Sequence, residues 1–412
     1  MMKILVLALD VPATSRMPGS PRLFNLCREL SRHHEMYLMT LCESQSRYDD
    51  FINDPASTYV FKRVEILPSP PPASWLGQQR HRIHLAAYFE TRFRHREFYY
   101  SIRAKILEVC ALEGVTLIYV DRMGMAQYVD CQVSVPVIVD MHDSSSLRLT
   151  RTLAFDLGIL SKLRTFLSLV RAKQLEKAIG KSCDLIITNS LVDECVVKEL
   201  SGSSRTMTIN NGVDMEFFTP SLNEIDPNML VFSGVMGYHP NEDAALYFAR
   251  DILPLIRAKC PYVEFWIVGS QPSDRVNELK QIPGIHVTGH VEDVRPFVRK
   301  AAVYVCPLRI GSGVKNKILA AMAMQKPTVA TSLSIDGLNL ADDREVLLAD
   351  EPQDFADKVV RLLTDQKAAQ QLGANGLARV QGEYSWGAMG KVLETAIQSL
   401  VASRNGCAYG PG

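Results

Sequence analysis

Residues 3–41 read KILVLALDVPATSRMPGSPRLFNLCRELSRHHEMYLMTL. The first seven, residues 3–9, form an apolar run, and residues 35–41 form a second one. Between them, residues 21–34 place apolar side chains at the spacing of an amphipathic helix. Short apolar strands separated by helices are typical of parallel sheets with both faces covered. The opening of the chain therefore predicts a strand–helix–strand unit of an α/β fold.

This alternation continues along the 412 residues of the chain. It predicts two α/β domains, each with a Rossmann-like doubly wound sheet. We expect an N-terminal domain over 1–209, a C-terminal domain over 210–385, a helix over 386–404 and a disordered tail over 405–412. The strands expected after the first two cover 116–120, 135–140, 184–188, 229–232, 262–268, 285–288, 303–306, 328–331 and 345–348. Long helices are expected at 159–182, 242–258 and 386–402.

Composition excludes several classes of protein. Lys plus Arg equals Asp plus Glu, 45 of each, and a formal net charge of zero argues against a nucleic acid partner. The nine cysteines are scattered, odd in number and without C-x-x-C spacing, so neither a disulfide framework nor a zinc site is expected. No apolar run reaches the 18 residues of a membrane span, which favours a cytoplasmic protein.

One region departs from the alternating pattern. Residues 48–82 hold five prolines and are expected to form an exposed loop. Residues 80–105 are rich in Lys and Arg, with Tyr and Phe between them. This pattern fits an ordinary surface helix with an aromatic core face. It also fits peripheral contact with an anionic membrane, or with another anionic partner.

The segment 307–338 carries the strongest chemical pattern. Gly311, Ser312 and Gly313 stand at the start of a helix, with Arg309, Lys315 and Lys317 around them. A glycine turn, the N–H groups of a helix start and several cations together suit a diphosphate without a metal ion. The alternative is a solvated turn with ordinary surface lysines.

Two loops of the N-terminal half are further candidates. Gly19 precedes a helix start in the first loop, where backbone N–H groups could face a phosphate or form an ordinary turn. His142 and Asp143 follow a buried strand, at the end where ligands bind in such sheets. The sequence contains no H-E-x-x-H motif and no D-x-D pair.

Several motifs in order resemble one family. They are the NGVD segment at 211–214 with Phe217, Phe218 and Pro220, the YHPN segment at 238–241, GHVEDVRP at 289–296, the run 311–331 and Tyr384-Ser385-Trp386. Together they resemble the GT-B glycosyltransferases, specifically retaining family four of group 1 type, in its bacterial polysaccharide-associated subgroup. The resemblance covers about residues 205–400 well, and the N-terminal half more loosely.

The resemblance implies transfer of a sugar from a nucleotide-diphosphate sugar to a glycan, glycolipid or other acceptor. The two domains would face each other across a cleft, and the last helix would cross back to the first domain. His142 would act at the donor sugar as the catalytic residue. Substrate would be bound by the remaining candidates: Gly19, Asp143, Arg309, Gly311, Ser312, Gly313, Lys315, Lys317 and Asp336. No metal and no cofactor are implied, since the nucleotide sugar is a substrate.

The sequence departs from the family pattern at a position that bears on activity. Ala320 stands where the family has a Glu that binds the ribose. This substitution favours one alternative to an active transferase, a GT-B-like protein without turnover that acts as a binding or scaffold partner. A nucleotide-sugar epimerase of the same fold is a further alternative, which would need catalytic carboxylates in the cleft. We expect the protein in the cytoplasm, at the inner face of the membrane when its acceptor is lipid-linked.

Overall fold

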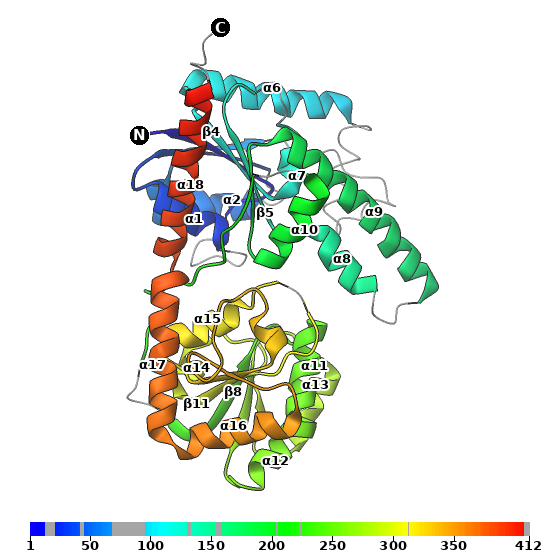
Figure 1. The fold of residues 1–412 in the computed structure, drawn as a ribbon, viewed down its shortest axis with the longest axis vertical. Coiled ribbons are helices and arrows are strands. Elements are labelled where there is room, and N and C mark those ends of the chain that lie inside the picture. The colour runs from blue at the N-terminus through cyan, green and yellow to red at the C-terminus, as the bar shows by residue number, and fades with distance from the viewer. Residues whose placement is uncertain are drawn as a thin grey trace. The chain divides into compact units, whose positions relative to one another are not determined.

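The computed structural model describes residues 1–12, 21–41, 45–67, 95–129, 133–153, 158–202, 205–221, 225–311 and 313–407. The chain divides into two compact units (Figure 1). Unit 1 comprises residues 1–209 and 390–412, and unit 2 comprises residues 210–389. Each unit contains one parallel β-sheet with helices packed on it, so the expected two α/β domains are present.

The sheet of unit 1 has seven strands in the order β3-β2-β1-β4-β5-β6-β7. The chain order reverses between β1 and β4, so loops leaving these two neighbours diverge and open a binding position at their carboxyl ends. Its strands are β1 (Lys3–Ala8), β2 (Glu35–Leu41), β3 (Phe61–Leu67), β4 (Leu117–Asp121), β5 (Val137–His142), β6 (Leu185–Thr188) and β7 (Thr206–Thr208). Its helices are α1 (Arg22–Leu30), α2 (Gln45–Asn53), α3 (Pro55–Val60), α6 (Arg96–Glu113), α7 (Arg122–Ala126), α8 (Ser145–Leu153), α9 (Ile159–Ser182) and α10 (Leu191–Ser201).

The sheet of unit 2 has six strands in the order β10-β9-β8-β11-β12-β13. Here the order reverses between β8 and β11. The strands are β8 (Asp226–Ser233), β9 (Glu264–Val268), β10 (Ile285–Val287), β11 (Ala301–Cys306), β12 (Thr328–Ala330) and β13 (Leu347–Leu348). The helices are α11 (His239–Tyr247), a π-helix η1 (Phe248–Ile252), α12 (Leu253–Arg257), α13 (Asp274–Glu278), η2 (Leu279–Gln281), α14 (Arg295–Lys300), α15 (Asn316–Ala323), η3 (Ser332–Ile335), α16 (Pro352–Thr364) and α17 (Gln366–Glu383). The last helix, α18 (Trp386–Cys407), begins in unit 2 and belongs to unit 1 from Gly390 onward.

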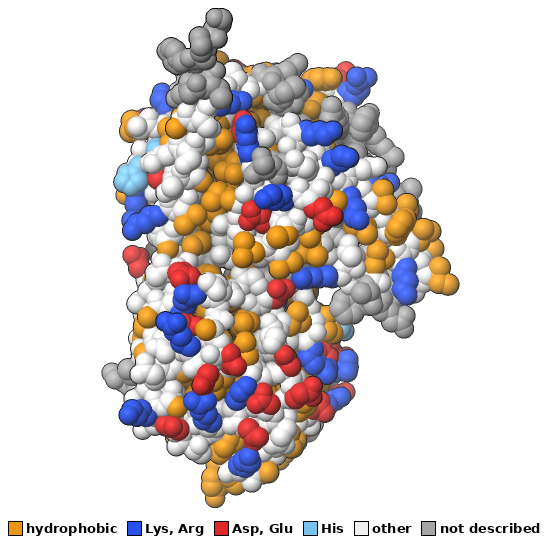
Figure 2. All heavy atoms as spheres, in the orientation of Figure 1, with side chains coloured by type: hydrophobic (Ala, Val, Ile, Leu, Met, Phe, Trp, Pro, Cys, Tyr) orange, Lys and Arg blue, Asp and Glu red, His pale blue; other side chains and the backbone are white. Residues whose placement is uncertain are grey.

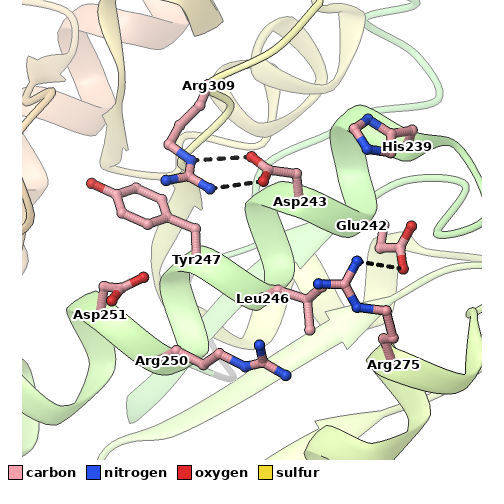
Figure 3. Close-up of a pocket in the computed structure, with 9 residues that line it drawn as sticks. All are labelled: His239, Glu242, Asp243, Leu246, Tyr247, Arg250, Asp251, Arg275 and Arg309. Atoms are coloured by element: carbon pink, nitrogen blue, oxygen red, sulfur yellow. Dashed lines mark hydrogen bonds and ion pairs between the residues drawn. The ribbon is translucent and has the colours of Figure 1, made fainter. Parts of the chain in front are cut away.

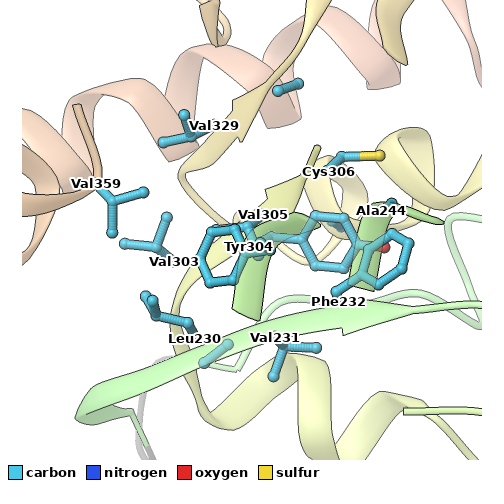
Figure 4. Close-up of a cluster of buried hydrophobic side chains, with 14 of the residues drawn as sticks. Leu230, Val231, Phe232, Ala244, Val303, Tyr304, Val305, Cys306, Val329 and Val359 are labelled. Carbon is cyan, nitrogen blue, oxygen red and sulfur yellow. The ribbon is translucent and has the colours of Figure 1, made fainter. Parts of the chain in front are cut away.

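The core of unit 2 explains why its central strands read as apolar runs. Leu230 and Phe232 of β8 and Val303 and Val305 of β11 are fully buried. They pack between the helices on both faces of the sheet, and Figure 4 shows them with the neighbouring Tyr304. A strand that is covered on both faces keeps no polar face, which removes the two-residue alternation of an exposed strand.

The prediction of an exposed loop over residues 48–82 is wrong for its described part. Residues 45–67 form α2, α3 and the edge strand β3. Asp54 caps α3 by accepting a hydrogen bond from the Ala56 N–H, and Pro55 fits the first helical turn. The strand was missed because its FKRVEIL sequence exposes charged side chains; Lys62, for example, pairs with Glu35 of β2. The rest of that segment lies outside the described residues.

The prediction of a disordered tail over 405–412 is wrong for its described part. Helix α18 continues to Cys407, so residues 405–407 are helical, and residues 408–412 lie outside the described part. From Gly390 onward the helix clusters with unit 1. There His34 of unit 1 lies 2.7 Å from Glu394, measured from Nε2 to Oε2.

Candidate functional site

The first group of candidate residues lies at the switch point of unit 2. Strands β8 and β11 are hydrogen-bonded neighbours, and their loops leave the carboxyl edge of the sheet in different directions. The loop after β8 leads through Gly234 to α11, and the loop after β11 leads through residues 307–315 to α15. Ligands of doubly wound sheets bind at such a position.

Lys317 is the most deeply placed cation of this group. Its Nζ lies 2.7 Å from Oδ1 of Asn241, to which it donates a hydrogen bond, and 4.5 Å from the centre of the Phe232 ring. Burial lowers the pKa of Lys317 to about 8. This half-buried ammonium has an amide oxygen as its partner and no carboxylate partner among the described residues. An anion at this edge of the sheet would supply one.

Glycines bring the backbone close around Lys317. A Cβ on Gly234 would lie 2.7 Å from the Lys317 Nζ, and a Cβ on Gly269 would lie 1.8 Å from the Gly234 carbonyl oxygen. Any side chain at position 269 would therefore displace the loop after β8. Gly311 and Gly313 have φ values of 132° and 73°, in the region that favours glycine. The loop at the start of α15 thus depends on its glycines for its conformation.

The start of α15 offers polar groups in the same place. Lys315 precedes the helix, and its ammonium donates a hydrogen bond to the Gly313 carbonyl. Among the residues that the structure describes, no side chain caps this helix start. The first N–H groups of a helix are unpaired within it and carry the positive end of its dipole. Ser312 lies outside the described residues.

Arg309 is engaged with α11. Its guanidinium forms two hydrogen bonds to the Asp243 carboxylate, at 3.1 and 2.7 Å, and lies 4.1 Å from the centre of the Tyr247 ring. Figure 3 shows these three residues in a polar pocket. Lys317 bonds Asn241, two residues before Asp243, and side chains two apart point to different sides of a helix. Arg309 and Lys317 therefore contact different sides of α11.

Asp336 and Ala320 complete the predicted group in unit 2. Asp336 follows η3, whose Ser334 donates a hydrogen bond to the Cys306 carbonyl at the end of β11, so Asp336 belongs to the same edge of the sheet. Ala320 lies on α15 three residues after Lys317 and keeps part of its surface exposed. Residues three apart share a helix face.

The second group lies at the carboxyl edge of the sheet in unit 1. His142 ends β5 with a φ of 64°, which is unusual for a residue with a side chain. Its Nε2 lies 2.8 Å from Oδ1 of Asp121, the last residue of β4. Its N–H donates to Oδ1 of Asp140 at 3.2 Å, and its carbonyl accepts from Asn189. Both the ring and the backbone of His142 are held in place.

A buried charge cluster supports this backbone. Arg22 donates to Asp140 from Nε at 2.8 Å, and the Tyr119 hydroxyl donates to it at 2.5 Å. Burial by itself would raise the pKa of Asp140, but Arg22, His142 and Tyr119 outweigh it, and the pKa lies below its ordinary value. Asp140 is therefore a carboxylate in the core of the unit.

The loop after His142 is anchored by a glutamate of α9. Asp143 is exposed, whereas Ser144 and Ser146 are buried. The Ser146 hydroxyl donates to Glu176 at 2.6 Å, the Ser146 N–H donates at 3.1 Å and the Ser144 hydroxyl at 3.2 Å. Burial raises the pKa of Glu176, and the hydrogen bonds from the two serines oppose that rise. Through Glu176 the loop at the carboxyl end of β5 is joined to α9.

Sequence reasoning did not identify Asp121, Arg22 or Asn241. Asp121 could have been recognised from the sequence, because it ends an apolar strand in YVD (119–121), just as Asp140 does in IVD (138–140). Asn241 and Arg22 could not be identified from the sequence, because their partners Lys317 and Asp140 lie 76 and 118 residues away along the chain. Gly19 lies outside the described residues. The two groups belong to different units, and the structure describes each unit separately.

Two further findings concern ligands and membranes. Among the described residues, no group of three or more His, Cys, Asp or Glu side chains could hold a metal ion. In that same part of the chain, no helix has the length and apolar character needed to cross a bilayer.

Comparison with known proteins finds a family match within the C-terminal unit. Residues 227–365 match the model of the "Glycosyl transferases group 1" family. The capsular polysaccharide biosynthesis glycosyltransferase CapM of Staphylococcus aureus is 24% identical over 235 residues, 54% of this chain and 60% of CapM. An uncharacterized glycosyltransferase of Methanocaldococcus jannaschii is 25% identical over 299 residues, 70% of this chain and 75% of that protein.

Two solved structures are similar over nearly the whole chain. Sucrose-phosphate synthase of Thermosynechococcus elongatus has a TM-score of 0.67 at 18% identity, covering 98% of this chain and all of the synthase. Anabaena HepE, solved in complex with UDP, has a TM-score of 0.65 at 15% identity, covering 97% of this chain and all of HepE. The chain thus has the two Rossmann-like domains of the GT-B fold, and its residues 227–365 are similar to the group 1 glycosyl transferases.

Proposed function

We propose that this protein transfers a sugar from a nucleotide-diphosphate sugar to a glycan or lipid-linked acceptor, with retention at the anomeric carbon and without a metal ion. The observation that carries the proposal is Lys317, a half-buried cation at the β8–β11 switch point without a carboxylate partner among the described residues. The match to group 1 glycosyl transferases spans the same strands and α15.

The arrangement suits the departure of a nucleoside diphosphate. When the bond from the anomeric carbon to the diphosphate oxygen breaks, its electron pair stays on that oxygen. Negative charge therefore grows where Lys317 and the start of α15 stand. Cations and N–H groups already in place stabilise this charge more in the transition state than in the ground state. The acceptor oxygen bonds to the anomeric carbon on the same face, and its proton is released with the diphosphate.

For the remaining candidates we propose roles by position. His142, with its ring held by Asp121, would contact the donor sugar, and Asp143 and Gly19 would lie on the substrate side of unit 1. Arg309 would add positive charge near the diphosphate from the other side of α11. Asp336 would add a polar contact at the same edge of the sheet.

For the pathway we propose surface polysaccharide assembly in the cytoplasm of a bacterium. The support is the similarity to CapM, whose name assigns it to capsular polysaccharide biosynthesis. Membrane contact through residues 80–105 stays a prediction. The described part of that segment belongs to α6, where Lys105 pairs with Glu65 and Glu108, as in an ordinary surface helix.

A second candidate function rests on Ala320. A methyl group cannot accept hydrogen bonds from a ribose, and charged hydrogen bonds contribute about 1.5–3 kcal/mol each. A protein that binds nucleotide weakly and does not turn over would act as a binding partner in the same assembly.

A thermal-shift series with UDP, GDP, ADP, TDP and CMP, each with and without EDTA, tests the proposal. We expect one diphosphate to raise the melting temperature equally in both conditions. Lys317→Met should abolish this shift, whereas Lys280→Met, at an exposed lysine of the same unit, should leave it intact. Loss of the shift in EDTA would contradict a metal-free site. No shift with any nucleotide would contradict the donor site altogether.

A further inference from the structure

Helix α9 exposes an unusual amount of apolar surface. Ile159 is 90% exposed, Leu160 64% and Leu163 54%. Figure 2 shows apolar side chains gathered over α9 at the right-hand edge of the molecule. We call the whole set the α9 stripe: Ile159, Leu160, Leu163, Phe166, Leu167 and Val170, each at least 40% exposed.

The stripe lies on one side of the helix. At about 100° per residue, its six side chains fall within an arc of about 120°. The residues that α9 buries against its own unit, among them Leu169, Ala172 and Leu175, lie on the opposite side. The stripe is therefore no part of the core of unit 1. It is a second apolar face of a helix whose first face is already packed.

Cations border the stripe on both sides. On the same helical projection, Lys162 and Lys173 flank one edge, and Arg164 and Arg171 flank the other. All four are exposed, and none of them pairs with a carboxylate among the described residues. Between Ser144 and Leu175 the sequence has six Lys or Arg and a single acidic residue, Asp156. The surface is thus apolar along its middle and positive along its borders.

We propose that the α9 stripe docks on an anionic lipid bilayer, with α9 lying in the interface. An apolar stripe of this width, bordered by Lys and Arg, fits the boundary between acyl chains and negatively charged headgroups. The positive borders select this partner over a second copy of the chain, because two copies facing each other would bring like charges together. The proposal does not depend on the proposed reaction.

Sedimentation of the full-length protein with vesicles tests it. We expect binding to vesicles that contain phosphatidylglycerol at 50 mM NaCl, and little binding to pure phosphatidylcholine or at 500 mM NaCl, where screening removes the electrostatic part. The Leu163→Glu/Phe166→Glu variant should bind at least about tenfold more weakly. Tyr262→Glu, at an exposed apolar residue of unit 2, should bind as the unaltered protein does.

A second readout identifies the contact itself. Phe166→Trp should shift its emission to the blue on anionic vesicles and be quenched by brominated lipid, whereas Tyr262→Trp should not. Vesicle binding that survives Leu163→Glu/Phe166→Glu would overturn the proposal, as would the absence of any binding at low salt. Concentration-dependent dimerisation that this double variant abolishes, without lipid binding, would also overturn it and assign the stripe to a second copy.

Discussion

The Nε2 of His142 lies 2.8 Å from Oδ1 of Asp121, so a residue at the end of β4 orients the ring at the end of β5. The first prediction follows from this pair. Asp121→Asn keeps the shape of the partner but removes its charge. We expect turnover of the donor to fall about 10- to 100-fold, because a misplaced group near the reacting atoms costs that much.

The same variant should leave nucleotide binding unchanged, since Asp121 and Lys317 belong to different units. The measurement is kcat for transfer or donor hydrolysis, set beside the nucleotide Kd. Glu199→Gln, at an exposed carboxylate of α10 in the same unit, is the control. An equal loss of nucleotide affinity in Asp121→Asn would show damage beyond the His142 ring.

The second prediction concerns pH. Burial lowers the pKa of Lys317 to about 8. Its side chain is therefore mostly protonated and positively charged below that pH, and mostly neutral above it. Affinity for the nucleoside diphosphate should therefore fall as pH rises, by about tenfold between pH 7 and pH 9. Calorimetry near pH 8 should also show proton uptake on binding. Lys317→Met should bind weakly and without this dependence, and a flat profile for the unaltered protein would refute the assignment.

The third prediction restores a carboxylate. Ala320 lies on the same face of α15 as Lys317 and is partly exposed, so a longer side chain has room to extend. Ala320→Glu should tighten nucleoside diphosphate binding by about tenfold, through charged hydrogen bonds to the ribose. The gain should disappear with the 2′,3′-dideoxy nucleotide. Equal gains with both nucleotides would point to a cause other than the ribose.

The fourth prediction concerns the buried cluster beneath His142. Asp140→Asn removes the carboxylate that Arg22 binds in the core, which should cost roughly 3–5 kcal/mol of unfolding free energy. Denaturant unfolding of the full chain measures it. Asp357→Asn, which breaks the exposed pair with Lys259, should leave the unfolding curve unchanged. Similar curves for the two variants would show that the Arg22–Asp140 pair does not carry this stability.

Much of the fold was predictable because central strands are apolar along their whole length. The runs at 35–41 and 184–188 became β2 and β6 almost residue for residue. The edge strand β3 was missed for the opposite reason. Exposed on much of its surface, it carries Lys62, Arg63 and Glu65, and its ion pairs replace the apolar contacts that mark a buried strand.

The site was only partly predictable. The glycines and lysines before α15 can be recognised because they are adjacent in sequence. The partner of Lys317 is Asn241, 76 residues away, and only the neighbouring positions of β8 and β11 bring the two together. The α9 stripe escaped detection because the helix is apolar on two opposite sides, and in a sequence such a helix resembles one that is buried all round.

Helix α9 also connects the α9 stripe to the loop after His142, through Glu176. This residue holds Ser144 and Ser146 just after His142, and it lies on the same unbroken helix as Phe166, about 15 Å along the axis. Residues of one continuous helix move together, so a displacement at Phe166 also displaces Glu176. The amide proton of Ser146 is donated to Glu176, so its exchange rate with deuterated solvent should change when the far end of α9 binds a membrane.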